Sequence, residues 1–286
     1  MSANIERLQE QREKIANRLW NETLWVESAK LRKCGSPLSL VCTSCGRIHE
    51  TQQHCNRRYC PPCARTRANT LCDRYGPVVE NLKWPLFLTL TQPRTPDDDA
   101  EFLLTRIKES VKRFRKLKWF TDKVAGGVGA IEVASGHSPG YHVHWHGILD
   151  CRWLSVTTHP PGRHLSKDAK RAIYQRAQKE IAHQWSLACR VESAGIYLRR
   201  ASPDTIREVL KYSVSPEALL DRKNSIAELV IAMTGRHLVA SWGSIRKLTK
   251  QLKDESTEDE SGLPCECGNP CWDIVGPSGL PGHISI

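Results

Sequence analysis

The sequence predicts an α+β fold in which a central antiparallel sheet is flanked by helices and carries a small zinc-ribbon appendage. Predicted strands are mixed with helices along the 286 residues, and a Gly/Ser/Pro turn joins two of them, 128–134 and 141–150, as in a hairpin. Two Cys-x2-Cys knuckles lie in the stretch 34–63, which is too short to build a hydrophobic core of its own. These observations predict one α+β core with a metal-dependent module before it.

The elements follow from local patterns. Apolar residues at helical spacing among many charges predict one or two amphipathic helices within 5–31. Alternating apolar and polar residues predict a strand over 85–91, and residues 97–117 open with acids and close with bases, as a helix dipole favours. Ser166 is the expected N-cap of another helix. The remaining elements are helices over 64–82, 166–187, 203–212, 216–233 and 244–252, and strands over 191–199 and 237–241.

Four segments are expected along the chain. Residues 1–33 form a helical segment, 34–82 a zinc-knuckle module with a connecting helix, 83–253 the catalytic core, and 254–286 an acidic linker with a C-terminal cysteine cluster. The glycine-rich residues 126–129 are interpreted as a turn before a strand.

Charge and composition narrow the range of functions that the sequence allows. The formal net charge of +11 indicates a polyanionic partner such as DNA, although a basic protein without a nucleic-acid role is the alternative. The chain has no apolar run long enough for a bilayer span, and its charged start lacks the apolar region of a signal peptide. We therefore expect a soluble, cytoplasmic, prokaryotic protein with no membrane partner. Twelve cysteines in such a setting indicate metal sites rather than disulfides.

The knuckle cysteines predict structural zinc. Cys42, Cys45, Cys60 and Cys63 supply four thiolates, with fourteen residues between the knuckles, close to a zinc-ribbon pattern. Other side chains nearby could replace one ligand or build a second site: Cys34, His49, His54 and Cys55. The basic string 56–59 inside this loop, followed by Arg65 and Arg67, fits a nucleic-acid contact or a solvated surface.

A second zinc site is expected near the C-terminus. Cys265, Cys267 and Cys271 offer three thiols there, and the fourth ligand is left open among three residues: His283, Cys34 and Cys55. A reducible tail without metal is the alternative. The remaining cysteines fall inside predicted regular elements and are expected in the core: Cys72, Cys151 and Cys189.

Three histidines share one face of the strand over 141–150. His142, His144 and His146 alternate along it, so all three side chains project to the same side, where burial without a partner would be costly. Imidazoles with one carboxylate suit a borderline divalent ion, and Glu132 on the neighbouring strand could lie opposite them. A pH-sensitive histidine cluster is the alternative.

A tyrosine follows on a predicted helix. Glu208 and Tyr212 are four residues apart and so share one helix face. A phenol is a poor nucleophile unless a cation stabilises its phenolate, and Lys211 or a metal-bound phosphate could do so.

Four features in this order resemble the HUH endonuclease superfamily, specifically the rolling-circle replication initiators of small plasmids that carry an N-terminal zinc-knuckle segment. They are the Phe-Leu-Thr-Leu-Thr strand at 87–91, Glu132, the His-Trp-His run at 144–146, and the Glu-Val-Leu-Lys-Tyr run at 208–212. The Gly-Arg-His segment at 235–237 and the Ser-Trp-Gly segment at 241–243 resemble the end of that domain. The resemblance spans about residues 40–250.

The resemblance implies a function. A nickase core with an RRM-like sheet would bind Mg²⁺ or Mn²⁺ through His144 and His146, with Glu132 as third ligand and His142 as a neighbour or alternative ligand. Tyr212 would attack an origin-DNA phosphate, leaving a 5′-phosphotyrosine and a 3′-OH, and Glu208 would activate water in termination. Members often carry a lysine shortly after the tyrosine; Ser215-Pro216 occupies that region here, and Lys211 is its expected replacement.

The sequence also indicates partners and alternatives. No glycine is followed by lysine, so a P-loop is absent and unwinding would need a host helicase, with a host DNA polymerase extending the 3′-OH. A transposase of the same chemistry remains an alternative, as does a zinc-bearing nucleic-acid-binding regulator without catalysis.

Overall fold

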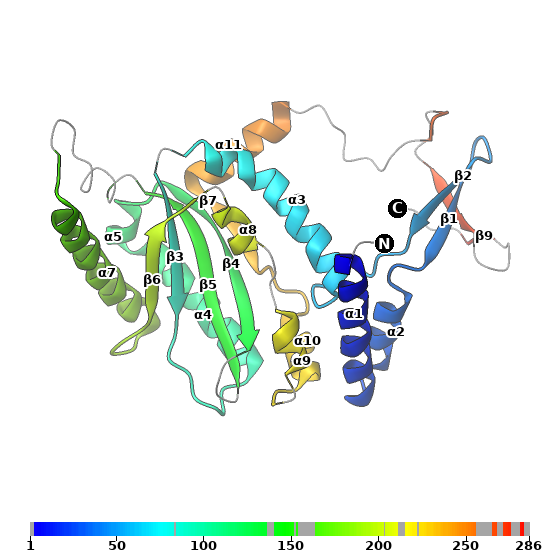
Figure 1. Cartoon of the computed structure of the whole chain (residues 1–286), viewed down its shortest axis with the longest axis horizontal. Coiled ribbons are helices and arrows are strands. Elements are labelled where there is room, and N and C mark those ends of the chain that lie inside the picture. The colour runs from blue at the N-terminus through cyan, green and yellow to red at the C-terminus, as the bar shows by residue number, and fades with distance from the viewer. Residues whose placement is uncertain are drawn as a thin grey trace.

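A five-stranded antiparallel sheet forms the centre of the molecule (Figure 1). From edge to edge, its strands are β6 (Ile196–Arg200), β3 (Pro85–Thr91), β5 (Tyr141–Asp150), β4 (Gly126–Ser135) and β7 (Val239–Trp242). The predicted α+β class, with an antiparallel sheet flanked by helices, is confirmed. The computed structural model describes residues 3–82, 84–135, 140–151, 153, 164–202, 204–210, 215–221, 223–255, 265–267, 271–275 and 281–282.

The predicted hairpin is the pair β4–β5. The two strands run antiparallel from Gly126, opposite Asp150, to Ser135, opposite Tyr141. Along β5, burial alternates as the sequence pattern predicts: Val143 and Trp145 are buried, while the three histidines between and beside them are only partly buried. The register therefore fixes which side chains of β4 share the histidine face.

One face of the sheet packs on a large hydrophobic core. Val143 and Trp145 of β5 belong to the same buried cluster as Trp185. Three helices pack on this side: α4 (Ala100–Lys116), α7 (Lys167–Cys189) and α10 (Ile226–Met233), and a short α5 (Lys118–Thr121) follows α4. Asp99 caps the start of α4 by accepting from the Phe102 N–H (2.6 Å). Ser166, as predicted, caps α7 by accepting from the Ala169 N–H (3.1 Å).

The other face of the sheet carries a second buried cluster at one end. This cluster joins Phe87, Val128 and Ile148 of the sheet to Val79 and Val209. Val79 lies on α3 (Pro61–Glu80) and Val209 on α8 (Thr205–Leu210). A third helix, α11 (Gly243–Glu255), also contributes to this cluster. Beyond this cluster, the same face presents the histidines of β5.

The N-terminal segment forms two helices, α1 (Ala3–Asn21) and α2 (Trp25–Lys33), within the range predicted for one or two. Arg18 of α1 donates hydrogen bonds to carbonyls that follow or end a short helix of the core: Leu219 (2.9 Å), Asp221 (2.8 Å) and Asn224 (2.7 Å). That helix is α9 (Pro216–Leu220). The N-terminal helices are thus fastened to the α9–α10 connection.

A second, smaller sheet was not predicted. Its order is β2 (Ile48–Gln52), β1 (Pro37–Cys42), β8 (Trp272–Val275) and β9 (Pro281–Gly282). Strand β8 pairs antiparallel with β1, with Trp272 opposite Cys42, so a C-terminal segment lies against the N-terminal hairpin (Figure 1).

Two local predictions were wrong. The helix expected over 216–233 is interrupted after Leu220, and α10 begins only after Ser225, whose hydroxyl accepts from the Glu228 N–H (3.2 Å). The glycines of 126–129 lie within β4 rather than in a turn. Two of them make room for aromatic rings, since a Cβ on Gly127 would stand 2.4 Å from the Trp242 ring and one on Gly129 2.2 Å from the Trp145 ring. The helices that the structure describes include none with the length and apolarity that crossing a bilayer requires.

Candidate active site and metal centres

Glu132, His144 and His146 converge on the partly covered face of the sheet. Glu132 lies directly opposite His144 across the β4–β5 pair, and His146 is two residues along β5 on the same face. One carboxylate oxygen of Glu132 is 3.2 Å from His144 Nε2 and 2.9 Å from His146 Nε2. The three ligand atoms lie within 4.8 Å of one another. The hairpin register brings together the ligand set expected from the sequence.

Neighbours on β3 hold His146 in place. The Thr89 hydroxyl is 2.9 Å from His146 Nδ1, opposite it in the register, and the Phe87 ring stacks on the imidazole at a centroid distance of 5.7 Å. A hydrogen bond at Nδ1 fixes the ring orientation and leaves Nε2 directed at Glu132. Thr89 was not singled out in the sequence, although its place two residues after Phe87 puts it on this face.

The charge of Glu132 is stabilised by its neighbours. Burial disfavours the carboxylate, but hydrogen bonds and charge from His144 and His146 outweigh burial and lower the pKa of Glu132 to about 2. His142 is not part of the cluster; its ring centroid lies 5.3 Å from that of His144. Burial, followed by the charges of His144 and Arg94, lowers the pKa of His142. Its position fits a neighbour of the ligands.

Two imidazoles and one carboxylate can hold a borderline divalent ion and leave coordination positions for phosphate oxygens. The donor set suits Mg²⁺ less well than a softer ion such as Mn²⁺, because imidazole is a softer ligand than oxygen. The three donors thus fit a site for a divalent ion.

Glu208 lies on the same side of the sheet. It forms an ion pair with Arg199 of β6, whose guanidinium also donates to the Thr205 hydroxyl (3.0 Å) and lies 4.3 Å from the centroid of the Phe87 ring. Phe87 in turn stacks on His146, so a continuous row of contacts links Glu208 to the metal cluster. Arg199 was missed in the sequence, where only its alternation along the β6 strand could have indicated this face. Lys211 and Tyr212 lie outside the described residues.

The knuckle thiols form two clusters rather than the predicted single ribbon. Cys60 and Cys63 join Cys34 and Cys55, with Sγ–Sγ distances of 3.4 Å (Cys34–Cys63), 3.6 Å (Cys34–Cys60) and 3.7 Å (Cys55–Cys63). A tetrahedral zinc with Zn–S bonds of about 2.3 Å requires ligand sulfurs about 3.8 Å apart. Hydrogen bonds from Cys55 and Cys60 lower the pKa of Cys63, as suits a thiolate ligand. We call this set the inner cluster.

The other knuckle pairs with the C-terminal cysteines. Cys42 and Cys45 lie with Cys267 and Cys265, at Sγ–Sγ distances of 3.6 Å (Cys42–Cys267) and 3.5 Å (Cys45–Cys265). Backbone hydrogen bonding from Cys45, with other donors, lowers the pKa of Cys42 to about 6. We call this set the outer cluster; it corrects the predicted four-ligand grouping of the two knuckles.

Of the other described residues considered as zinc ligands, none joins the outer cluster. Cys271 is not one of the four outer thiols; its carbonyl accepts from the Thr43 N–H (3.3 Å). Cys34 and Cys55, considered for the C-terminal site, belong to the inner cluster, and His283 falls outside the described residues. His49 and His54 join neither cluster. As predicted, three cysteines are buried elsewhere: Cys72, Cys151 and Cys189.

Comparison with known proteins gave one match. The family model described as "Replication protein" matches residues 46–266, a range that contains the whole central sheet and the Glu132, His144 and His146 cluster. Searches of curated proteins and of solved structures gave no match. The match supports a role in initiating DNA replication, and with it DNA as a partner. Since it covers most of the chain, the chain belongs to the Replication protein family.

Proposed function

We propose that this protein is a metal-dependent, site-specific single-strand DNA endonuclease and strand transferase that initiates rolling-circle plasmid replication. The observation that carries the proposal is the cluster of Glu132, His144 and His146 on adjacent strands of an antiparallel sheet, in a chain of the Replication protein family. Family membership favours replication over transposition. A regulator without catalysis would have no use for a metal cluster that leaves positions open.

The flanks of segment 211–214 support Tyr212 as the nucleophile. Leu210 is buried against the sheet in the cluster that contains Phe87, and the Ser215 N–H donates to the Val133 carbonyl (3.1 Å), next to Glu132. Two residues of extended chain span at most about 7 Å, and three about 11 Å. The described residues on both sides of this segment, Leu210 and Ser215, thus contact the sheet that carries the metal cluster.

The proposed first step is a transesterification. The Tyr212 oxygen forms a bond to phosphorus and loses its proton, the P–O3′ bond breaks, and the departing oxygen takes up a proton to become a free 3′-OH. A bound divalent ion would supply charge neutralisation at the phosphate, and Glu132, His144 and His146 would hold it there. Lys211 would stabilise the phenolate. Because the tyrosyl ester keeps the phosphodiester energy, a later 3′-OH can reseal the strand without ATP.

Glu208 would act in termination, by taking a proton from the water that hydrolyses the tyrosyl ester. Its ion pair with Arg199 holds the carboxylate on the same row of contacts as His146. Changing Glu208 to Ala is expected to leave the first nick within about threefold of wild type while slowing hydrolytic release roughly 10²-fold, within the usual range for a general base. Single-turnover assays on labelled origin DNA would separate the two rates.

Glu217→Ala removes an exposed carboxylate from the neighbouring helix and serves as the control for charge. It should change neither rate. Equal losses of nicking and release in Glu208→Ala would contradict the assigned role.

Both cysteine clusters would hold structural zinc. Metal analysis of the purified protein is expected to find about two Zn per chain, since each cluster offers four thiols at near-tetrahedral distances. Cys60→Ser should lose the inner zinc and Cys265→Ser the outer one, each leaving about one. His144→Ala, and Cys189→Ser at a buried cysteine outside the clusters, should keep both. A content of one zinc in wild type, unchanged by Cys265→Ser, would remove the outer site.

The rest of the pathway falls to partners. A host helicase would unwind the duplex, and a host DNA polymerase would extend the 3′-OH that nicking leaves, because the chain lacks a P-loop.

A further inference from the structure

A basic cavity lies between the inner cysteine cluster and the C-terminal end of α10. It encloses about 250 Å³, and its polar side is formed by the loop 56–59, which runs between the cluster residues Cys55 and Cys60. Val230 and Met233, both buried, form an apolar side. The cavity therefore joins the cysteine module to the catalytic core.

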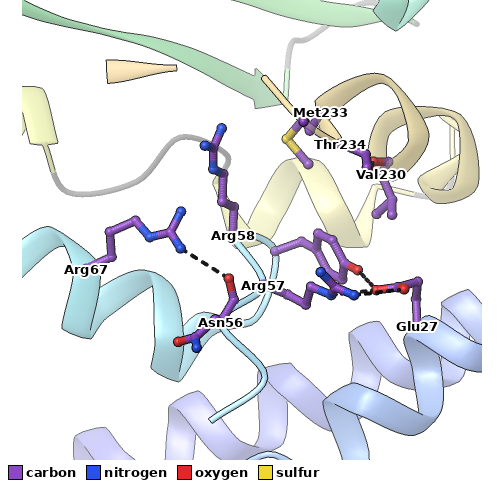
Figure 2. A pocket seen from close by; sticks show the side chains of 10 residues that line it. Glu27, Asn56, Arg57, Arg58, Arg67, Val230, Met233 and Thr234 are labelled. Atoms are coloured by element: carbon purple, nitrogen blue, oxygen red, sulfur yellow. Dashed lines mark hydrogen bonds and ion pairs between the residues drawn. The ribbon is translucent and has the colours of Figure 1, made fainter. Parts of the chain in front are cut away.

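Charge in the cavity is unbalanced. Three of its lining residues are arginines, and Glu27 is the one carboxylate among them. Glu27 is already engaged: its oxygens are 2.8 Å from Arg57 Nε and 2.8 Å from Lys30 Nζ, and it accepts from the Tyr59 hydroxyl. Figure 2 shows Arg57 turned toward Glu27, away from the other two arginines.

Among the described residues, Arg58 and Arg67 have no carboxylate partner. Within the described part of the chain, neither forms an ion pair; Arg58 donates to the Arg236 carbonyl, and Arg67 to the Asn56 carbonyl (3.2 Å). They extend on the same side of the loop (Figure 2). Burial, and then the charge of Arg67, lowers the pKa of Arg58. An arginine stays charged in a protein, so two of them facing one space favour an anion between them.

The scaffold of this site is rigid. Asn56 adopts a left-handed backbone conformation (φ +53°) that turns its carbonyl to Arg67, and the cysteines on both sides of the loop belong to the inner cluster. Arg58 is anchored to the segment after α10 through the Arg236 carbonyl. A donor array fixed in this way loses little freedom when it binds.

We propose that Arg58 and Arg67 hold a backbone phosphate of the DNA substrate in this cavity. Guanidinium groups match phosphate oxygens in a bidentate manner, and the apolar side formed by Val230 and Met233 suits the deoxyribose that a free phosphate would lack. The inference rests on the proposed function for the identity of the nucleic acid. In this proposal, the inner cluster fixes a DNA-positioning loop against the catalytic core.

The test measures DNA binding without chemistry. In Tyr212→Phe protein without added divalent ion, the Arg58→Ala/Arg67→Ala pair is expected to weaken binding of a fluorescent single-stranded oligonucleotide at least tenfold at low salt. The slope of log K against log salt should shrink by about 0.7 for the single phosphate lost. Fluorescence anisotropy over a salt series gives both quantities.

A double variant of matched charge is the control. Arg7 and Arg171 are exposed arginines outside the cavity, and Arg7→Ala/Arg171→Ala removes the same two charges. It should reduce affinity less than threefold. Equal losses in the two double variants would overturn the proposal, because net charge alone would then explain them. If the Arg58 change impairs folding, as zinc content would reveal, Arg67→Ala alone should still lower affinity and slope, since Arg67 is exposed.

Inorganic phosphate distinguishes the two sources of the anion. Calorimetric titration at constant ionic strength should detect at most weak binding to wild type. Tight phosphate binding that the double variant abolishes, with oligonucleotide affinity unchanged, would assign the cavity to free phosphate and overturn the DNA contact. The binding assay uses Tyr212→Phe protein, in which the proposed nucleophile is removed. A loss of binding in the Arg58→Ala/Arg67→Ala variant would therefore support the phosphate contact even if wild type forms no covalent adduct.

Discussion

Replacing Tyr212 with phenylalanine is expected to abolish the covalent protein–DNA adduct and to lower nicking by on the order of 10³-fold or more. The change keeps the aromatic ring and removes only the oxygen that would attack phosphorus. DNA binding should therefore remain within about twofold. Incubation with Mn²⁺ and labelled single-stranded origin DNA, followed by denaturing electrophoresis, would measure adduct and nick together.

Tyr197 provides the matched control. It lies on β6 opposite Thr89, on the metal face of the sheet, and is 54% exposed, so it is a rival candidate for the nucleophile. Its ring is 6.3 Å from that of Phe87, close to His146. Tyr197→Phe should nick at the wild-type rate. An adduct that persists in Tyr212→Phe and disappears in Tyr197→Phe would transfer the nucleophile to β6 and contradict the assignment of Tyr212.

The catalytic face could be predicted because its determinants are local. Alternation along 141–150 places three histidines on one side of a strand, and the few Gly, Ser and Pro residues that separate it from the preceding strand in the sequence predict an antiparallel pair. If Glu132 pairs directly opposite a histidine, the two side chains share a face of the sheet. If the register is shifted by one residue, Glu132 points to the other face. Thr89 lies 57 residues before His146, so no local pattern connects the two. Arg199 precedes Glu208 by only nine residues, but one lies on β6 and the other on α8, so their contact depends on how that helix packs on the sheet.

The cysteine grouping was mispredicted for a related reason. A Cys-x2-Cys knuckle fixes two ligands of a tetrahedral site, but the choice of the other pair depends on which segments the fold brings together. Pairing of β8 with β1 carries Cys265 and Cys267 to the first knuckle, across more than two hundred residues of chain. The second knuckle is then completed by Cys34, which precedes β1, and Cys55, which follows β2. Neither contact has a signature in the spacing of the cysteines.

Glu132→Gln and His144→Ala are each expected to lower metal-dependent nicking by on the order of 10²-fold, the scale of losing one preorganised electrostatic contribution in an active site. His144→Ala removes one of three ligand atoms that lie within 4.8 Å, and Glu132→Gln replaces a charged carboxylate with a neutral amide, which is a weaker ligand. The defect should shrink as Mn²⁺ is raised, because weaker binding is partly offset by mass action. Nicking rates and Mn²⁺ binding, followed by electron paramagnetic resonance, would test this.

Further variants distinguish a metal site from a cluster that only stabilises the sheet. Thr89→Ala leaves all three ligand atoms in place and removes only the hydrogen bond to His146 Nδ1, so a smaller loss of about tenfold in metal affinity is expected. His183→Ala removes an exposed histidine of α7 and should change nothing. If the cluster were merely a set of hydrogen bonds that stabilises the sheet, Glu132→Gln would lower thermal stability without altering the Mn²⁺ dependence. An unchanged Mn²⁺ requirement in both ligand variants would therefore place the catalytic ion elsewhere.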